Sequence, residues 1–194
     1  MNQKLVKAFM AGLLACGMVG CASQPAQQEE VQEEGTAHAG MANPNVYDVS
    51  EDEMTQKTGI SLPMPKEASD VKYNIIGETE EHPIAEVEFT LNGKKMYLRA
   101  QSTQLLPANP SASQEELEKY NISGLNYEWD TTQQEKVKYC EGFIFVNTKE
   151  GAGYIMWEDV VPGILYNLGM EKGADAQTLI ETANQVFVSA QGDN

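Results

Sequence analysis

The sequence predicts an α+β domain, in which an antiparallel sheet of about six to eight strands carries a long C-terminal helix on one face. Three observations support this prediction. Residues 71–102 alternate between apolar and polar side chains around Asn92-Gly93, residues 142–168 contain short apolar runs, and residues 176–190 repeat apolar side chains at helical spacing. The hairpin at Asn92-Gly93, with one apolar and one charged face, is expected to be antiparallel and half exposed.

The hairpin at residues 84–102 is the most clearly defined element. Between residues 84 and 91 the side chains alternate, so that one face carries Val87, Phe89 and Leu91 and the other carries Glu86, Glu88 and Thr90. Asn-Gly then favours a two-residue turn. Because one face is apolar and the other is charged, we expect the charged face, including Glu86 and Glu88, to lie in solvent.

Shorter elements are expected on both sides of the hairpin. Ser50 and Ser113 each precede a short helical stretch with a glutamate three residues on, which is the capping-box pattern. Gly59 would end the first helix, and Asp175 would cap the C-terminal one. Further strands are expected at residues 71–75, 124–129, 134–141, 142–147, 153–157 and 164–168.

The first 20 residues have the order of a secretory signal peptide: a basic start, an apolar run at 8–20 and a small residue before Cys21. Met18-Val19-Gly20-Cys21 resembles a bacterial lipobox, which directs lipid attachment to the cysteine, although Met18 replaces the usual leucine. Cys16 is a second candidate, but it leaves an apolar core of only about eight residues. An ordinary signal peptide with an incidental Cys21 is the remaining alternative. We expect export and lipid anchoring, through diacylglyceryl and palmitate chains, to the outer face of a bacterial cell membrane.

Residues 21–45 comprise the lipidated cysteine and a segment rich in Gln, Glu, Ala, Gly and Pro. Such a composition predicts a disordered tether with a reach of roughly 25–30 Å. A single domain would then occupy residues 46–194. The formal net charge of −16 opposes nucleic-acid binding and docking on anionic lipid through a basic patch.

Residues able to carry chemistry are few and scattered in the expected domain. Cys140 and His82 are its one cysteine and one histidine, and neither a Gly-x-Ser-x-Gly motif nor a clustered zinc-ligand pattern occurs. Carboxylate pairs such as Glu158-Asp159 are expected to be accidental in so acidic a chain. The acidic runs at 50–53 and 78–81 lack the calcium-loop pattern. The sequence therefore predicts no catalytic residues, metal or cofactor, and an inert, buried Cys140.

Aromatic side chains are the one suggestive group. Tyr127, Trp129 and Trp157 are candidates for stacking on a sugar ring or gripping a peptide. The alternative is that they belong to the core, because a domain of this size ordinarily buries its tryptophans.

Four stretches carry a resemblance to a known family: ISLPMPKEASDVKYNII, IAEVEFTLNGKKMYLRAQ, ISGLNYEW and YIMWEDVVPGILYNLGMEKGADAQTLIETANQVF. Over residues 58–188 the chain is similar to a bacterial family of small extracytoplasmic domains of unknown function, found in predicted lipoproteins and membrane-tethered proteins. The resemblance implies a sheet-plus-helix domain outside the cell membrane, and it transfers no catalytic residue to this chain.

These observations favour a non-enzymatic surface lipoprotein that binds an unknown protein or small-molecule ligand, or senses envelope conditions. The first alternative is a cell-envelope hydrolase or an accessory factor to one, which would need two inward-facing acids on the sheet. The second is a lipid-handling shuttle, which would need an apolar cavity between sheet and helix.

Overall fold

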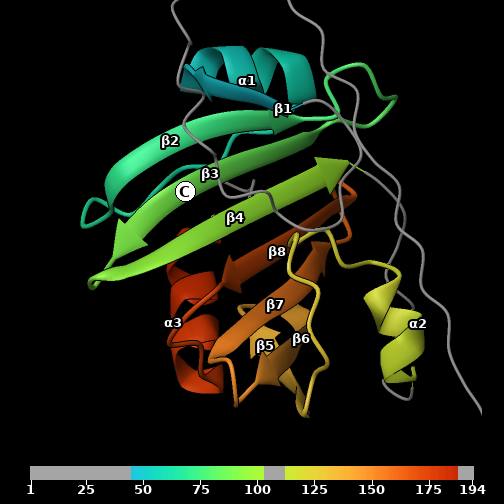
Figure 1. The fold of residues 1–194 in the computed structure, drawn as a ribbon. Helices are drawn as coiled ribbons and strands as arrows, with labels where there is room; N and C mark the ends of the chain where they lie inside the picture. Colours follow the sequence, from blue (N-terminus) through green and yellow to red (C-terminus); the bar gives the residue numbers. More distant parts are fainter. Residues whose placement is uncertain (1–44, 103–111, 188–194) are drawn as a thin grey trace, which may run out of the picture. The chain divides into compact units, whose positions relative to one another are not determined.

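A computed structural model describes residues 45–102 and 112–187 (Figure 1). They form one eight-stranded sheet and three helices. The strands are β1 (Asn45–Val49), β2 (Ser69–Ile76), β3 (Ile84–Leu91), β4 (Lys94–Ser102), β5 (Thr131–Val137), β6 (Cys140–Asn147), β7 (Ala152–Asp159) and β8 (Ile164–Met170). The helices are α1 (Glu51–Thr58), α2 (Gln114–Glu118) and α3 (Ala176–Val186).

All neighbouring strands are antiparallel, in the order β1-β2-β3-β4-β8-β7-β6-β5. The predicted antiparallel sheet is therefore confirmed. The C-terminal helix is present but short: α3 has 11 residues, and Phe187 after it has extended backbone with φ −76° and ψ 99°. The rest of the predicted helical stretch, residues 188–190, lies outside the described residues.

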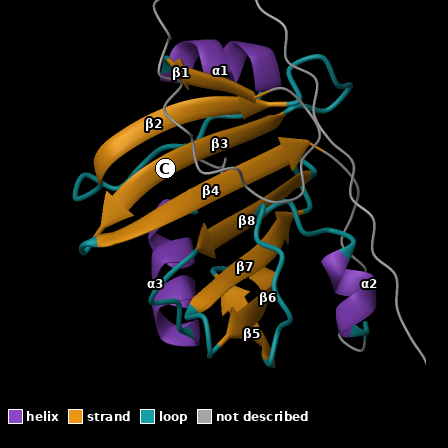
Figure 2. Cartoon of the chain, viewed as in Figure 1, coloured by secondary structure: helices purple, strands orange, loops and turns teal. Residues whose placement is uncertain are grey.

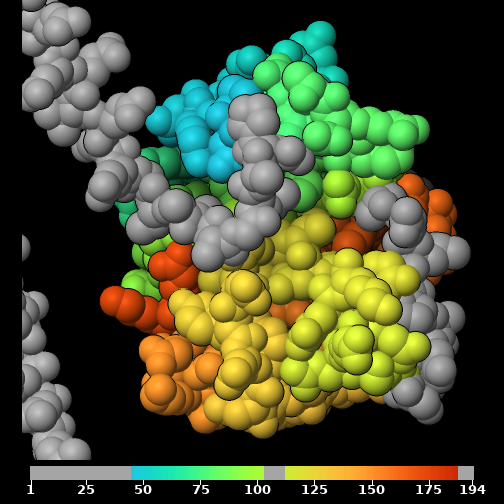
Figure 3. All heavy atoms as spheres, turned by 45° about the vertical axis from the view of Figure 1, so that its right-hand side comes forward, coloured from blue at the N-terminus to red at the C-terminus, as the bar shows by residue number. Residues whose placement is uncertain are grey.

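The two faces of the sheet have different covers (Figure 2). On the face that we call the helix face, α1, α3 and the residues after α1 pack on the larger apolar cluster, which includes Met54, Phe89, Trp157 and Leu179. On the other face, residues 112–130 cross the sheet and pack on a smaller cluster around Phe145 and Tyr154. We call residues 112–130 the strap; it is the yellow segment spread across the surface in Figure 3.

The helix caps predicted from the sequence are present, and they provide partners for backbone groups at the helix ends. The Ser50 and Asp175 side chains accept hydrogen bonds from the backbone of Glu53 and Thr178, and Gly59 ends α1 in the left-handed region at φ 73°. Ser113 forms the complete capping box with Glu116. Hydrogen bonds from Thr178 hold the pKa of Asp175 below its usual value.

The β3–β4 turn has the backbone that Asn-Gly predicts. Asn92 and Gly93 have φ of 53° and 73°, so both central residues are left-handed, as a tight hairpin turn requires. The register runs without a shift from Leu91 opposite Lys94 to Ala85 opposite Ala100.

Three expectations from the sequence are wrong. Residues 124–129 are not a strand but part of the strap, and the strand expected at 134–141 is β5, which ends at Val137. The hairpin is not open to solvent on its charged face, because the strap covers part of it and buries Glu86 to 2% exposure. In addition, β1 pairs with β2 although no strand was expected there. Among the helices of residues 45–102 and 112–187, none has the length and apolar composition of a membrane-spanning segment.

Candidate functional site

A row of four polar side chains crosses the strap face from β2 to β8. Asn74, Glu86, Arg99 and Asn167 are directly opposite one another in the register of β2, β3, β4 and β8. Directly opposed residues in a sheet project to the same face with their Cβ atoms about 5 Å apart. All four are buried, with exposures of 4%, 2%, 1% and 0%. We call these four residues the polar row.

An ion pair lies at the centre of the polar row. The Arg99 guanidinium donates from Nε to Glu86 Oε2 at 2.6 Å, and its Nη2 forms an ion pair with the same oxygen at 2.5 Å. Asn74 Nδ2 donates to the other carboxylate oxygen, Glu86 Oε1, at 2.9 Å, and Asn74 Oδ1 accepts from the backbone of Asp48 in β1 at 3.2 Å. Both oxygens of the buried carboxylate are thus satisfied, as burial of a charge requires.

The strap closes over this pair at its turn, residues 121–125. Arg99 Nη1 donates to the Ile122 carbonyl oxygen at 3.0 Å. Gly124 has φ +78°, and a Cβ placed on it would lie 2.4 Å from Arg99 Nη1. The guanidinium can therefore approach the strap only because residue 124 has no side chain and adopts a left-handed backbone.

The strap turn also holds itself together. Asn121 Oδ1 accepts from the backbone and hydroxyl of Ser123, at 2.9 and 2.5 Å, and Asn121 Nδ2 donates to the Leu125 carbonyl at 2.8 Å. Ser123 and Leu125 then sit above β8, where a Cβ on Gly169 would meet both side chains. The turn is thus a preformed unit resting on the β4–β8 pair.

Asn167 is the unusual member of the polar row. Its side chain is fully buried beside Arg99, yet neither Oδ1 nor Nδ2 has a hydrogen-bond partner. A buried amide without partners costs on the order of 1–3 kcal/mol. An amide that keeps both its donor and its acceptor free matches the donor and acceptor of another amide group. The structure therefore presents an unused polar pair beneath the strap turn.

Sequence reasoning missed Asn74, Arg99 and Asn167, and it placed Glu86 in solvent. The sequence did contain a signal for Arg99, which is the one arginine in a chain whose other cationic side chains are lysines. An arginine serves where a planar, multiply bonded cation is needed, and a lysine does not replace it. Asn74 and Asn167 gave no such signal, because a polar residue in an alternating strand is ordinarily assigned to the solvated face.

The candidate stacking aromatics are all in or beside the core. Trp157 is fully buried on the helix face, stacked on Tyr166 at 5.2 Å and edge-on to Phe187 at 5.8 Å. Trp129, in the strap, is half-buried and packs edge-on against Tyr154 at 5.0 Å. Tyr127 is 37% exposed and contacts Trp129. The ring faces of Trp157 are therefore occupied by core neighbours, and only Tyr127 of the three presents substantial surface.

Cys140 lies in a buried corner of the helix face at the start of β6. Burial and the nearby carboxylates of Asp159 and Glu158 raise the pKa of its thiol to about 11. Asp159 is itself buried to 2% exposure and accepts from the Tyr139 hydroxyl at 3.2 Å. The thiol is therefore protonated near neutral pH, and a protonated thiol is a poor nucleophile.

The remaining sequence candidates stay apart from the polar row. His82 is exposed in the β2–β3 turn, and Gly151 to Gly153 form a turn and the start of β7. Within residues 45–102 and 112–187 no group of three or more His, Cys, Asp or Glu side chains is arranged to hold a metal ion. Cys16, Cys21 and the expected tether lie outside the described residues.

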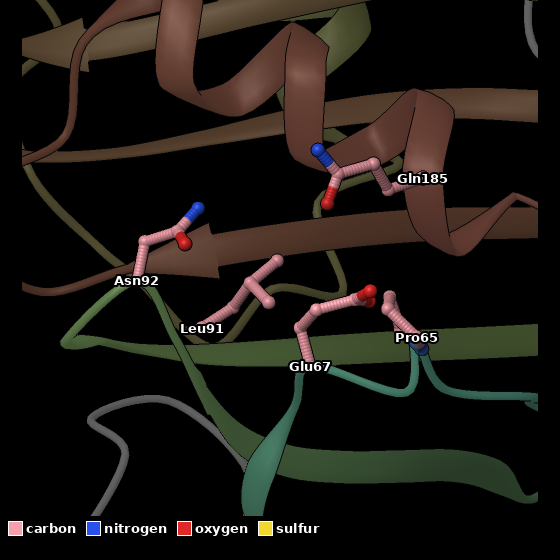
Figure 4. A pocket seen from close by; sticks show the side chains of 5 residues that line it. All are labelled: Pro65, Glu67, Leu91, Asn92 and Gln185. Atoms are coloured by element: carbon pink, nitrogen blue, oxygen red, sulfur yellow. The ribbon is translucent and has the colours of Figure 1, made fainter.

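An open hollow of about 440 Å³ lies on the other side of the sheet from the polar row. Figure 4 shows its lining: Leu91 and Asn92 from the β3–β4 turn, Gln185 from α3, and Pro65 and Glu67 from the segment before β2. Its polar groups are two amides and one carboxylate on the rim. The hollow is an alternative place for a polar ligand. Its polar side chains are exposed, so water satisfies their hydrogen bonds and they give no indication of a ligand.

Comparison with protein-family models, with curated proteins and with solved structures gives no match to this chain.

Arg99→Met is expected to lower the free energy of unfolding by about 3–5 kcal/mol, because it leaves the Glu86 carboxylate buried without its cation. Urea denaturation measures the loss. The matched control is Lys95→Met in the same strand, whose partner Glu88 is 2.8 Å away and whose side chain is 52% exposed. It should cost less than about 1 kcal/mol. Equal losses in the two variants would contradict a structural role for the buried pair.

Gly124→Ala tests the close approach of the strap to Arg99. Gly163→Ala is its control, because Gly163 has φ +69° but no atom within 4 Å of the position that a Cβ would take. The control should cost about 1–2 kcal/mol for the left-handed backbone alone. Gly124→Ala should cost clearly more in the same urea titration, since the guanidinium must also move. Indistinguishable losses would mean that the strap is not held against Arg99.

Alkylation of Cys140 should be slow at neutral pH and should accelerate only as the pH approaches about 11. The measurement is the iodoacetamide rate in a chain carrying Cys16→Ser and Cys21→Ser, with and without urea. Asp159→Asn removes one of the carboxylates that raise the pKa, so its rate should rise at a lower pH. Rapid modification of the folded protein at pH 7 would show instead an activated thiol.

Proposed function

We propose that this chain is an exported lipoprotein, anchored to the outer face of a bacterial membrane through Cys21, whose domain is a non-enzymatic binding or sensing module. The anchor rests on the order of basic, apolar and small residues before Cys21. The same location is what the resemblance suggested by the sequence of residues 58–188 would imply. The binding role rests on the polar row.

The observation that carries the binding role is the fully buried, unpartnered amide of Asn167 beside Arg99. A buried polar group without partners is costly to folding, and such groups concentrate where a protein uses them for another purpose. The neighbouring ion pair is already satisfied within the fold, so it supplies a fixed polar wall and Asn167 supplies the free donor and acceptor. The ligand that this arrangement fits is a small polar molecule or peptide that presents an amide group.

Ligand entry requires the strap turn to lift, because the polar row has no direct path to solvent in the closed arrangement. The turn is suited to moving as a unit, since the side chains of Asn121 and Ser123 bond within residues 121–125. The hydrogen bond from Arg99 to the Ile122 carbonyl joins the turn to the polar row. Opening the strap would break this bond while leaving the turn intact. Such a hinge-like cover is a common route to binding sites and to ligand-dependent switching.

The two other functions suggested by the sequence have less support. A hydrolase needs two acids on one face that are free to exchange protons, and Glu86 is held by Arg99 and Asn74. Glu158 and Asp159 are also buried, but as consecutive residues of β7 they project to opposite faces of the sheet. A lipid shuttle needs an apolar cavity, and the apolar side chains on both faces pack against one another in clusters. The lipid shuttle gives a distinct result in the mass measurement below, and the hydrolase is tested by a separate turnover assay.

The test is the native mass of the chain from Cys21 onward, purified from its own cell envelope, compared with Asn167→Leu. We expect a non-covalent adduct on the wild type that denaturation removes, and at least a tenfold weaker adduct on the variant, because the amide contacts are lost. Asn167→Leu should also unfold at equal or higher urea concentration than the ligand-free wild type, since it removes an unsatisfied buried group.

Met156→Leu is the matched control, because Met156 is the apolar neighbour of Asn167 in the next strand. It should keep the adduct. A bare wild-type mass would contradict small-ligand binding and direct the search to protein partners cross-linked on intact cells. A lipid adduct that Asn167→Leu retains would support the shuttle, and turnover of an envelope polymer would support the hydrolase.

A further inference from the structure

One end of the sheet holds the start of the described domain together with several turns. Because every neighbouring pair is antiparallel, the register places Asn45 beside Ile76, and Asp159 beside Ile164. The β2–β3, β5–β6 and β7–β8 turns therefore lie at the same end of the strands as Asn45. The β2–β3 and β7–β8 turns are on the right-hand side of Figure 1. We call this the entry end of the sheet.

The entry end also gathers exposed apolar side chains. Of the five large hydrophobic residues that are exposed in the described ranges, four lie at this end or within two residues of it: Tyr47, Tyr139, Val160 and Val161. The fifth, Tyr127, is in the strap. The clearest case is the β7–β8 turn, in which Val160 is 66% exposed and Val161 is 83% exposed.

The two valines have no evident part in forming their turn. The backbone N–H of Gly163 donates to the carbonyl of Asp159 at 2.9 Å, and Gly163 takes the left-handed conformation that the turn needs. Turn positions normally favour Gly, Pro, Asn, Asp and Ser. Consecutive β-branched apolar residues at the tip of a turn therefore indicate contact with something outside the fold.

We propose that the entry end rests on the lipid surface, with Val160 and Val161 inserted among the headgroups and Tyr139 at the interface. This inference rests on the proposed lipid anchor at Cys21. The anchored segment would lead into Asn45, at this same end, and its expected reach is roughly 25–30 Å. The β7–β8 turn is about five strand spacings, or roughly 24 Å, from β1, so the turn is within the reach of the anchor. Tyrosine is a favoured residue at membrane interfaces.

The anchor also makes weak insertion sufficient. Two valines and one tyrosine bury too little apolar area to hold a free domain on a membrane. Attachment through a tether of the expected reach, however, raises the effective concentration of the second contact to the millimolar range. The docked state should therefore be populated when the chain is coupled to lipid and sparsely populated when the same chain is free.

Charge at the entry end predicts the sign of the salt effect. The β2–β3 turn carries Glu78, Glu80 and Glu81 at this end. Basic groups here include Lys57, which pairs with Glu78, and Lys138, which is exposed beside Tyr139. The acidic turn repels anionic headgroups, so docking should be stronger on uncharged phosphatidylcholine than on vesicles containing phosphatidylglycerol. Salt should reduce this difference by screening the repulsion. Docking through a basic patch would show the opposite dependence.

The experiment couples the chain from Cys21 onward to a maleimide lipid through Cys21, which supplies the anchor chemically. Hydrogen exchange is then measured on phosphatidylcholine vesicles and on the free chain. We expect exchange in residues 158–164 to slow about tenfold or more on vesicles, while residues 147–151, in the β6–β7 turn at the opposite end, do not change. Val160→Asp/Val161→Asp should abolish the slowing without loss of stability, because both side chains are exposed.

Lys149→Asp is the matched control. It changes the net charge by the same amount as the double valine variant, at the opposite end of the sheet, where the Lys149 side chain is 86% exposed. It should leave the slowing intact. Unchanged exchange at residues 158–164 on vesicles, or equal slowing at both ends, would overturn the docking proposal. The anchor itself is tested separately, by a diacylglyceryl mass on Cys21 in chain extracted from membranes, so the two proposals can fail independently.

Discussion

The buried ion pair between Glu86 and Arg99 is the constraint on which the strap face depends. Taking two charges out of water costs several kcal/mol per ion unless geometry and further hydrogen bonds compensate. The ion pair joins β3 to β4. Its further hydrogen bonds come from Asn74 in β2 and from the Ile122 carbonyl in the strap, and the Asp48 backbone in β1 in turn bonds Asn74. The pair therefore couples the hairpin to segments far from it in sequence.

The same constraint accounts for the irregular character of the strap. A regular strand or helix across the guanidinium would place a Cβ where Gly124 now approaches it, 2.4 Å from Arg99 Nη1. The chain instead makes a left-handed turn whose side-chain polar groups bond within residues 121–125. A cover of this kind shields the pair from water, yet it keeps its own shape through internal bonds. A buried polar row beneath a cover that holds its own shape is the basis of the binding role that we propose.

The two proposals assign different work to different parts of the domain. The polar row and the strap lie across the middle of one face. The β7–β8 turn, with Val160 and Val161, lies at the entry end of the sheet. A domain held by that end would keep its strap face directed along the membrane rather than into it, and the strap would remain free to open. Membrane contact and ligand binding are thus compatible in one molecule.

Much of the fold could be predicted from short sequence patterns, because these patterns depend on residues close together in the chain. Backbone geometry and residues a few positions apart determine the Asn92-Gly93 turn and the alternation in β3 and β4. The same holds for the helix caps at Ser50, Ser113 and Asp175. The strand expected at residues 124–129 failed for the complementary reason. Its alternating aromatics meet the packing needs of a covering loop as well as those of a strand, and spacing alone does not separate them.

The order of residues was enough to predict the antiparallel sheet, its main turn, the helix caps and the acidic charge balance, since each depends on adjacent residues or on composition. It also indicated the exported, lipid-anchored location that we propose. Only the folded chain revealed three features. These are the burial of Glu86, the order Glu86, Arg99 and Asn167 along the polar row, and the end of the sheet that the β7–β8 turn shares with Asn45. The physical reason is that alternation shows which side chains share a face but not what covers that face, and the cover here comes from residues more than 20 positions away in the chain.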